Sequence, residues 1–371
     1  MRARELGITI GHMPPGARNA ITDVTGVAVG HATLIDGDGP LEVGSGPVRT
    51  GVTVILPHAG YIGEEPVFAG AHTLNGNGEL TGLEWVRESG MLTTPIGLTN
   101  THSVGVVRDA LVAASVRGAP AGRPRWALPV VGETWDGYLN DIDGQHVRAE
   151  HLFVALAAAS TGAVPEGNVG AGTGTKAFGF KAGIGTSSRV ADASHGGHTV
   201  GVLVQANHGR RDRLAIDGVP VGREITRDDV PPLEIRQPDG GSIIVVVATD
   251  APLLPHQCRR LAQRASLGIA RGGGGGEHSS GDMIIAFATG NRGLRPEEDE
   301  GAPPHAELRM LNDLHIDELF WATIEATEEA VVNALVAAET MTGRDGNTFH
   351  AIPHDRLRQV MARYGHGGEA G

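Results

Sequence analysis

The chain has 371 residues, with 30 basic against 43 acidic side chains, for a formal net charge of −13. Nucleic acid or an anionic membrane surface would call for clustered Lys and Arg, so this charge argues against both and favours small or protein-like partners. Glycine supplies 56 positions and apolar residues 40%, which predicts a folded protein with many tight turns and close backbone approaches.

Buried strands and helices are predicted in alternation along the chain. Apolar, β-branched runs bounded by Gly, Pro, Asn or Asp indicate strands, and longer amphipathic segments indicate helices. In chain order these are strands 51–57 and 94–100, helix 104–117 behind a candidate cap at Ser103, strand 127–133, helix 149–160, strands 198–207 and 242–250, helix 255–270, strand 282–290, and a long helix from about Asp317 to Thr342. This alternation favours layers of helix on sheet.

Cysteine content and hydropathy bear on the compartment. Cys258 is the only cysteine, so the chain has no intrachain disulfide and no multi-cysteine zinc site. The segment LGITI near the first residue is too short for a secretory apolar core, and no apolar run approaches the ~20 residues that span a bilayer. We expect a soluble cytoplasmic protein.

The most unusual local feature is RGGGGGEHSSG at residues 271–281. A glycine run is ordinarily a flexible surface linker. Here it leads abruptly into the strand predicted at 282–290, which weakens that interpretation. The charged stretch 292–307 is predicted to be an exposed excursion, and the last dozen residues a frayed tail.

Two weaker patterns could suggest cofactors. Gly170, Gly172 and Gly174 look like part of a dinucleotide fingerprint, but no strong strand precedes them and no amphipathic helix follows, so a glycine-built loop is favoured. His195 and His198 are spaced like metal ligands but stand in a segment that reads as a loop. We therefore expect no metal and no cofactor.

The serines after the glycine run suggest covalent catalysis. A serine hydroxyl needs a base, and one solution uses the nucleophile's own α-amine after the chain is cut just before it. Such an amine has a pKa of about 7.7–8.0, near the optimum for a general base at neutral pH. Glycines before the cut would let the backbone adopt a strained turn and then move away.

Further motifs are spread along nearly the whole chain in a fixed order. They are PPGARNAITDVTGVAVGH (14–31), NGNGELTGLEWVRESG (75–90), PIGLTNTHSVGVV (95–107), PVVGETWDGYLND (129–141), EGNVGAGTGTKAFGFKAGIGTSSR (166–189), VLVQANHG (202–209), SSGDMIIAFATGN (279–291), EATEEAVVNAL (325–335) and TGRDG (342–346). With these motifs the chain resembles the self-processing serine hydrolases that include L-aminopeptidase/D-Ala-esterase/amidases and β-peptidyl aminopeptidases.

The resemblance implies that Ser280 is the nucleophile and that the chain cuts itself between Ser279 and Ser280. The products would be a large subunit, 1–279, and a small subunit, 280–371, which stay together in one domain. A cut between His278 and Ser279 is the alternative, because two serines stand side by side.

It also implies roles for residues elsewhere in the chain. Asn207 matches the asparagine that donates to the oxyanion, although alone it would be read as a turn residue. Glu133 would pair with the ammonium group of the substrate's N-terminal residue. Trp135, Tyr138 and Asn140 are candidates for the pocket wall, and which tyrosine stands near the reacting carbonyl is left open.

A hydroxyl and a glutamate near the new amine form the last part of the implied site. Thr327 with Glu328 or Glu329 are the available matches, whereas adjacent glutamates on a helix are ordinarily a solvated face.

The fold implied is a single αββα domain, two stacked sheets flanked by helices, as in N-terminal-nucleophile hydrolases. The function implied is a serine aminopeptidase and amidase that acts through an acyl-enzyme on small peptides or aminoacyl amides and esters, as a homo-oligomer of processed heterodimers. Two alternatives stay open: an acyltransferase of the ornithine acetyltransferase type, and a non-processing small-molecule binding protein. The preference among L-, D- and β-amino N-termini is not encoded in these motifs.

Overall fold

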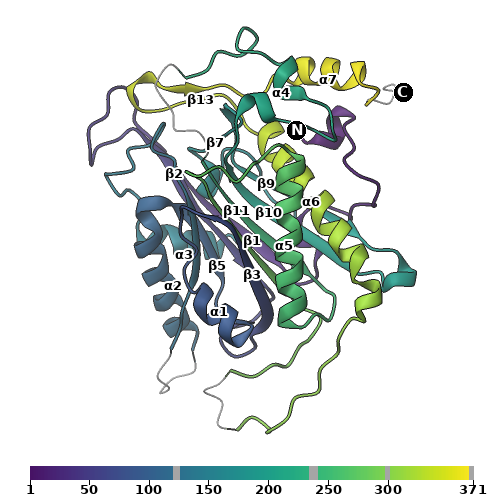
Figure 1. Ribbon diagram of the computed structural model, residues 1–371. Helices are drawn as coiled ribbons and strands as arrows, with labels where there is room; N and C mark the ends of the chain where they lie inside the picture. The colour runs from purple at the N-terminus through teal and green to yellow at the C-terminus, as the bar shows by residue number, and fades with distance from the viewer. Residues whose placement is uncertain (120–125, 234–240, 297–300, 367–371) are drawn as a thin grey trace.

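Two β-sheets stack face to face in the computed structural model, which describes residues 1–119, 126–233, 241–296 and 301–366 (Figure 1). The smaller sheet has the order β1 (Ala28–Asp36), β2 (Val48–Leu56), β5 (Ile96–Asn100), β6 (Val130–Thr134). The larger sheet has the order β4 (Met91–Leu92), β3 (Val67–Gly76), β12 (Gly281–Ala288), β11 (Ser242–Thr249), β10 (Thr199–Asn207), β9 (Ile184–Val190).

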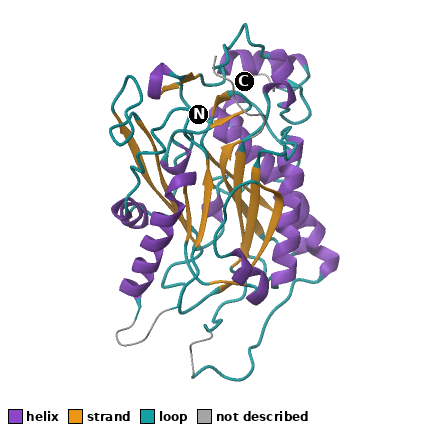
Figure 2. Cartoon of the chain, turned by 60° about the vertical axis from the view of Figure 1, so that its left-hand side comes forward, coloured by secondary structure: helices purple, strands orange, loops and turns teal. Residues whose placement is uncertain are grey.

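Helices cover the outer face of each sheet (Figures 1 and 2). The smaller sheet packs against α2 (Val104–Gly118) and α3 (Ala149–Ala157), and the larger against α5 (Pro255–Arg271) and α6 (Ile316–Val336). Shorter helices lie outside these layers: α1 (Leu83–Ser89), α4 (Val221–Glu224) and α7 (His354–Arg363). The order of layers is therefore helix, sheet, sheet, helix, as expected.

Side-chain alternation along β11 shows why the strands are apolar without interruption. Ile244 and Val246 point into the core between the sheets, whereas Ile243 and Val245 point into the core beneath α5 and α6. A third core fills the space between the smaller sheet and α2, with Val131 against Leu111. A strand buried on both faces has no polar face, so its sequence reads as a continuous apolar run.

The predicted strands and helices are confirmed, with two corrections at helix ends. The helix expected to run to Thr342 ends at Val336, and Met341–Thr342 instead form β13, which pairs with β14 (Thr348–Phe349). The chain leaves the helix where the Ala337 carbonyl oxygen comes within 2.4 Å of where a Cβ on Gly167 would lie. Ser103 precedes α2, but its hydroxyl makes no capping hydrogen bond.

Several elements were not predicted. These are β1, β3, β9, the short pair β7 (Lys176–Ala177) and β8 (Phe180–Lys181), and α7. The last dozen residues were expected to be a frayed tail, which is wrong as far as Arg363, because α7 extends to that residue and buries Leu357, Val360 and Met361. Residues 367–371 of the expected tail lie outside the described residues. Among the described helices, none has the length and apolarity that would let it cross a membrane.

Candidate active site

Three strands of the larger sheet bring the candidate residues together at one end. Gly281, the first residue of β12, pairs with Gly76 at the end of β3 and with Ser242 at the start of β11. Ser242 in turn pairs with Asn207 at the end of β10. Ser280 and Asn207, which are far apart in sequence, therefore belong to the same sheet edge.

Gly281 permits an unusually close backbone approach at this edge. A Cβ at position 281 would lie 2.5 Å from the carbonyl oxygen of Asn77, a distance that real side chains do not show. Just beyond, the register between β12 and β3 shifts between Asp282 and Met283. Such irregularities re-aim side chains next to functional sites. Position 281 is therefore glycine at least in part because the neighbouring backbone leaves no room for a Cβ.

The preceding glycine run is closely packed, which corrects the linker interpretation. Gly273 has φ +98°, and a Cβ there would lie 2.0 Å from the Arg213 carbonyl oxygen. A Cβ on Gly274 would lie 2.5 Å from the Ile269 side chain. Glycine is required here because the chain turns back against its own helix.

Ser280 is fully buried and its polar groups are engaged within the continuous chain. Its hydroxyl donates a hydrogen bond to Asp282 Oδ1 at 2.6 Å, and its backbone N–H donates to the Glu277 carbonyl at 2.8 Å. The carbonyl of Ser279, which belongs to the bond before Ser280, accepts a hydrogen bond from Asn77 Nδ2 at 2.7 Å. Ser280 therefore lies at the end of a turn that the rest of the site holds in place.

A cavity of about 620 Å³ adjoins this turn. Its lining includes Ser279, Asn207, Glu133, Trp135 and Tyr138. That volume is within the range of about 300–1,000 Å³ of small-molecule sites. Four predicted residues from two segments, 133–138 and Asn207, thus share one pocket with Ser279, whereas Ser280 itself is not among the lining residues.

Glu133 is a buried carboxylate at the end of β6 and is only 3% exposed. One oxygen accepts the backbone N–H of Glu79 at 3.0 Å, and the other accepts the hydroxyl of Thr101. Burial raises the pKa of Glu133 above its ordinary value, against these two hydrogen bonds. A bound ammonium group would supply the positive charge that this carboxylate lacks.

Asn207 is oriented as a donor. Its side-chain Oδ1 accepts the backbone N–H of Lys176 at 3.1 Å. The acceptor end of the amide is thereby used by the protein, which leaves the Nδ2 end to donate to a pocket ligand. This geometry suits the predicted oxyanion role.

Of the three residues predicted for the pocket wall, two line the cavity and one does not. Trp135 and Tyr138 line the cavity, and Tyr138 is held by an edge-to-face contact with Phe349 at 6.0 Å between ring centroids. Asn140 is not among the lining residues. Its side chain is 1% exposed, accepts the Arg49 N–H and donates to Asp136, so it stabilises the loop behind the pocket.

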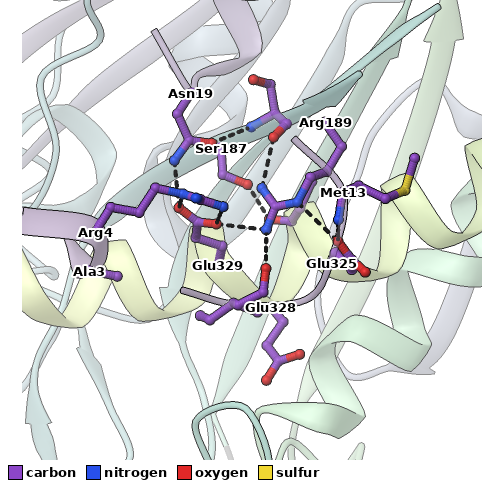
Figure 3. Close-up of polar contacts among 12 residues, drawn as sticks. Ala3, Arg4, Met13, Asn19, Ser187, Arg189, Glu325, Glu328 and Glu329 are labelled. Atoms are coloured by element: carbon purple, nitrogen blue, oxygen red, sulfur yellow. Dashed lines mark hydrogen bonds and ion pairs between the residues drawn. The ribbon is translucent and has the colours of Figure 1, made fainter. Parts of the chain in front are cut away.

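The predicted hydroxyl and glutamate pair on α6 does not meet Ser280 in this structure. Thr327 donates to the Thr323 carbonyl at 2.7 Å within its own helix. Glu328 pairs with Arg271 and accepts the Asp217 N–H. Glu329 pairs with Arg189 and Arg4 (Figure 3). Among the described residues, none of these contacts reaches the pocket, so their predicted catalytic roles have no support from the geometry.

Arg189 instead organises a buried ionic network. Its guanidinium contacts Glu329 at 2.6 Å and Glu325 at 3.1 Å, and Figure 3 shows both carboxylates turned toward it. Burial would raise the pKa of Glu329, but the charges of Arg189 and Arg4 hold that pKa below its ordinary value. The adjacent glutamates are thus neither a solvated face nor, on this geometry, part of the reacting centre.

Replacing Glu329 with alanine is expected to lower the free energy of unfolding by about 3–5 kcal/mol, because it removes one partner of a buried charge pair. Urea unfolding in a Ser280→Ala background, where the chain should stay in one piece, measures this loss. Glu318→Ala on the same helix serves as the control, with an expected loss below about 1 kcal/mol. Equal losses for the two variants would contradict a structural role for the network.

Asp282, Asn75 and Asn77 contact the turn before β12 and were not predicted from the sequence. All three stand in the motifs SSGD and NGNG, but their contacts depend on the pairing of β3 with β12. In the described part of the chain, no cluster of three or more His, Cys, Asp or Glu side chains could hold a metal ion.

Two stacked sheets between helix layers, with a serine preceding a central strand and a donor amide beside it, define a hydrolase of the N-terminal-nucleophile type. The family model of Peptidase family S58 matches residues 19–349, and the chain belongs to this family.

Solved structures with the same fold cover nearly the whole chain. A Burkholderia sp. β-aminopeptidase is 55% identical with a TM-score of 0.92, over 98% of this chain and 99% of that one. The L-aminopeptidase D-Ala-esterase/amidase of Ochrobactrum anthropi, described as a variant of the Ntn hydrolase fold, is 44% identical with a TM-score of 0.89, over 99% of both chains.

Among curated proteins, the β-peptidyl aminopeptidase of Sphingosinicella microcystinivorans is 48% identical, over 98% of this chain and 92% of the relative. The chain is therefore a serine-type aminopeptidase, with peptides or aminoacyl amides and esters as its class of substrate.

Proposed function

We propose that this aminopeptidase becomes active by cutting its own chain between Ser279 and Ser280, and that the mature enzyme then releases single N-terminal residues from peptides, amides and esters. One observation carries the proposal: the buried carboxylate of Glu133, the donor amide of Asn207 and the residue before the cut line one cavity. A carboxylate in such a place selects a substrate with a free ammonium group.

The proposed reaction requires Ser280, which is buried in the continuous chain and is not among the residues that line the cavity, to reach the substrate after the cut. After the cut, Ser280 carries a free α-amine that takes the proton from its own hydroxyl as Oγ attacks the substrate carbonyl. Asn207 Nδ2 donates to the developing oxyanion. The protonated amine then gives its proton to the leaving group, and water releases the acyl group from Ser280.

The proposal covers substrates with β-amino as well as α-amino N-termini, and the similarity to a β-peptidyl aminopeptidase and a β-aminopeptidase supports it. A panel of p-nitroanilides of L-alanine, D-alanine and β-homoalanine tests it, with N-acetyl-L-alanine p-nitroanilide as control. We expect release from the free amines and roughly 30-fold or more slower release from the acetylated compound, because acetylation leaves Glu133 without its partner, at a cost of roughly 2–5 kcal/mol. Equal rates would overturn the role given to Glu133.

Asn207→Asp is expected to lower kcat about 10²–10³-fold with little change in KM, since the donor acts on the transition state. Aspartate keeps the acceptor for the Lys176 N–H, so the local fold should be preserved. Steady-state kinetics on L-alanine p-nitroanilide measures the effect. Asn168→Asp is the matched control, because Asn168 Oδ1 also accepts a backbone N–H, that of Glu339 at 3.2 Å, but Asn168 does not line the cavity. An unchanged kcat in Asn207→Asp would assign the oxyanion to another donor.

We also propose that processed pairs associate into a homo-oligomer. Light scattering combined with size-exclusion chromatography tests this, and a mass equal to one processed pair would contradict it.

A further inference from the structure

A second cavity lies against the edge of the larger sheet. β4 pairs with Val67 and Phe68, and residues 69–73 beyond them form an edge of the described sheet. The cavity has a volume of about 680 Å³, with walls from residues 69–73 of β3, residues 86–90 at the end of α1 and the first half of α5. Both helices contact β3 (Figure 1). We call it the β3-edge cavity. Among the described residues, none lines both this cavity and the one that contains Glu133.

Two glycines let the elements around the β3-edge cavity approach one another closely. A Cβ on Gly70 would lie 2.4 Å from the backbone nitrogen of Arg259, and a Cβ on Gly90 would lie 2.4 Å from Cγ of Pro255. Such distances leave no room for a side chain, so α5 rests directly on β3 and on the residue that follows α1. The side chains that line the cavity are therefore carried on closely packed backbone.

Basic side chains predominate on the walls of this cavity. They are His72 on β3, Arg87 on α1, and His256 and Arg259 on α5. Among the described lining residues, Glu88 is the one carboxylate. The chain as a whole has a formal charge of −13, so the local balance of charge is opposite to that of the protein. A cavity with this excess of cationic groups favours an anionic ligand.

The positive charges converge on His72. Burial lowers the pKa of His72 below its ordinary value, and the charges of Arg259 and Arg87 lower that pKa further. The imidazole is half-buried and forms no hydrogen bond within the described part of the chain. An anion bound among the three side chains would cancel their mutual repulsion and supply the missing acceptor.

Several hydrogen-bond donors around the cavity have no acceptor. Arg259 forms no hydrogen bond or ion pair with a described residue, although its guanidinium carries five N–H groups. Arg87 pairs with Glu84 and donates from Nη2 to the Thr73 hydroxyl at 3.0 Å. That hydroxyl accepts the bond, so its own proton is left to donate into the cavity that Thr73 lines. Guanidinium groups match the oxygens of a phosphate group in geometry as well as in charge.

We propose that the β3-edge cavity binds a phosphate group, held by Arg259, Arg87 and His72. A doubly charged anion is favoured over a carboxylate because the charges of three basic side chains meet at one place. The volume also leaves room for a small molecule that carries the phosphate, since ligand sites typically have about 300–1,000 Å³. This binding site goes beyond the proposed function, because its lining residues take no part in the catalytic cavity.

The test is isothermal titration calorimetry of the purified full-length protein with inorganic phosphate. It is carried out at neutral pH in about 0.1 M NaCl, which screens weak attraction to the surface. We expect saturable binding of one phosphate per chain with a Kd of about 1 mM or below. Arg259→Gln and His72→Gln should each raise this Kd about tenfold or more, because each removes a charged donor.

Arg260→Gln is the matched control, since it removes the same charge one residue further along α5. Arg260 pairs with Asp313 at 3.2 Å and does not line the cavity. Because the salt screens charges that do not touch the ligand, the Kd of this variant should stay within about twofold of that of the wild type. Arg259 is exposed, so Arg259→Gln should fold normally, and thermal unfolding of each variant checks this.

A parallel titration with glycerol 3-phosphate distinguishes the two sources of a phosphate group. An affinity about tenfold higher than that of inorganic phosphate assigns the site to phosphate esters, whereas equal affinities assign it to free phosphate. Sodium acetate, whose anion carries a single charge, should bind about tenfold more weakly than either phosphate compound.

Four results would overturn the inference. They are the absence of saturable binding of both phosphate compounds, an unchanged Kd in Arg259→Gln, an equal loss of affinity in Arg260→Gln, and acetate binding as tight as that of phosphate. An unchanged Kd in His72→Gln would remove His72 from the site. Binding is measured without a peptide substrate, so each result holds whether or not the chain cuts itself or hydrolyses peptides.

Discussion

Replacing Ser280 with alanine is expected to leave one intact chain of 371 residues without aminopeptidase activity. Under the proposed function, the substitution removes the Oγ that would attack both the Ser279 carbonyl and the substrate, so both reactions should be lost together. Denaturing electrophoresis with intact mass should show fragments of 279 and 92 residues for the wild type and neither for the variant. Hydrolysis of L-alanine p-nitroanilide should fall to background.

Ser279→Ala is the matched control, because it makes the same change one residue earlier. If the bond before Ser280 is the one that breaks, this variant should still cleave, and the small fragment should keep its mass while the large one loses a single oxygen. A variant of Ser279 that stays intact, beside a Ser280→Ala chain that cleaves, would move the cut to the bond after His278.

The strands that sequence predicted best were those buried on both faces. In β10, β11 and β12 each apolar residue faces either the core between the sheets or the core beneath the helices, which explains their continuous apolar runs. β9 escaped because its middle residues are Ser187, Ser188 and Arg189, which are buried through hydrogen bonds rather than apolar contact. Hydropathy cannot register a strand whose burial depends on partners elsewhere in the chain.

In the candidate site, too, residues whose contacts lie far away in the sequence were the hardest to predict. Ser280, Asn207 and Glu133 were predicted from motifs that the chain shares with a family, and each stands at or near an end of an apolar strand. The apolar pattern alone would not have singled them out. Asn140 was misassigned because an amide reads the same whether it faces a pocket or, as here, Arg49 and Asp136 in the interior.

The glutamates of α6 were misread for a related reason. Their partners, Arg4, Arg189 and Arg271, lie far from them in sequence, and only the packing of the N-terminal segment, β9 and α5 on α6 identifies them. The contact of Asp282 with the Ser280 hydroxyl was not predicted, because the pattern Ser-Gly-Asp does not specify the direction of the serine side chain.

Glu133→Gln is expected to lower kcat/KM for substrates with a free amine by about 30-fold or more, since removing the charge of one partner of a buried charge pair costs roughly 2–5 kcal/mol. Glutamine has the same shape and can still meet the Glu79 N–H and the Thr101 hydroxyl, so the fold should be kept. The comparison substrate is propionyl p-nitroanilide, which lacks the amine, and the kcat/KM of its slow hydrolysis should change only severalfold.

The control is Glu79→Gln, which removes a carboxylate charge at the cavity rim. It should change kcat/KM for both substrates severalfold at most. A similar loss for both substrates in Glu133→Gln would mean that Glu133 does not bind the ammonium group.

The pH profile gives a second, independent readout of the same carboxylate. Burial raises the pKa of Glu133 above 4.5, and substrate binding requires the ionised form, so kcat/KM falls as the pH drops through that raised pKa. The Ser280 amine must be neutral to accept its proton, which adds a separate fall below its own pKa of about 7.7–8.0. The logarithm of kcat/KM in the wild type should therefore decline with slope one below the pKa of the amine and with slope two below that of Glu133. In Glu133→Gln the slope should stay at one, because only the amine then titrates; a slope of two in that variant would assign the second proton to a group other than Glu133.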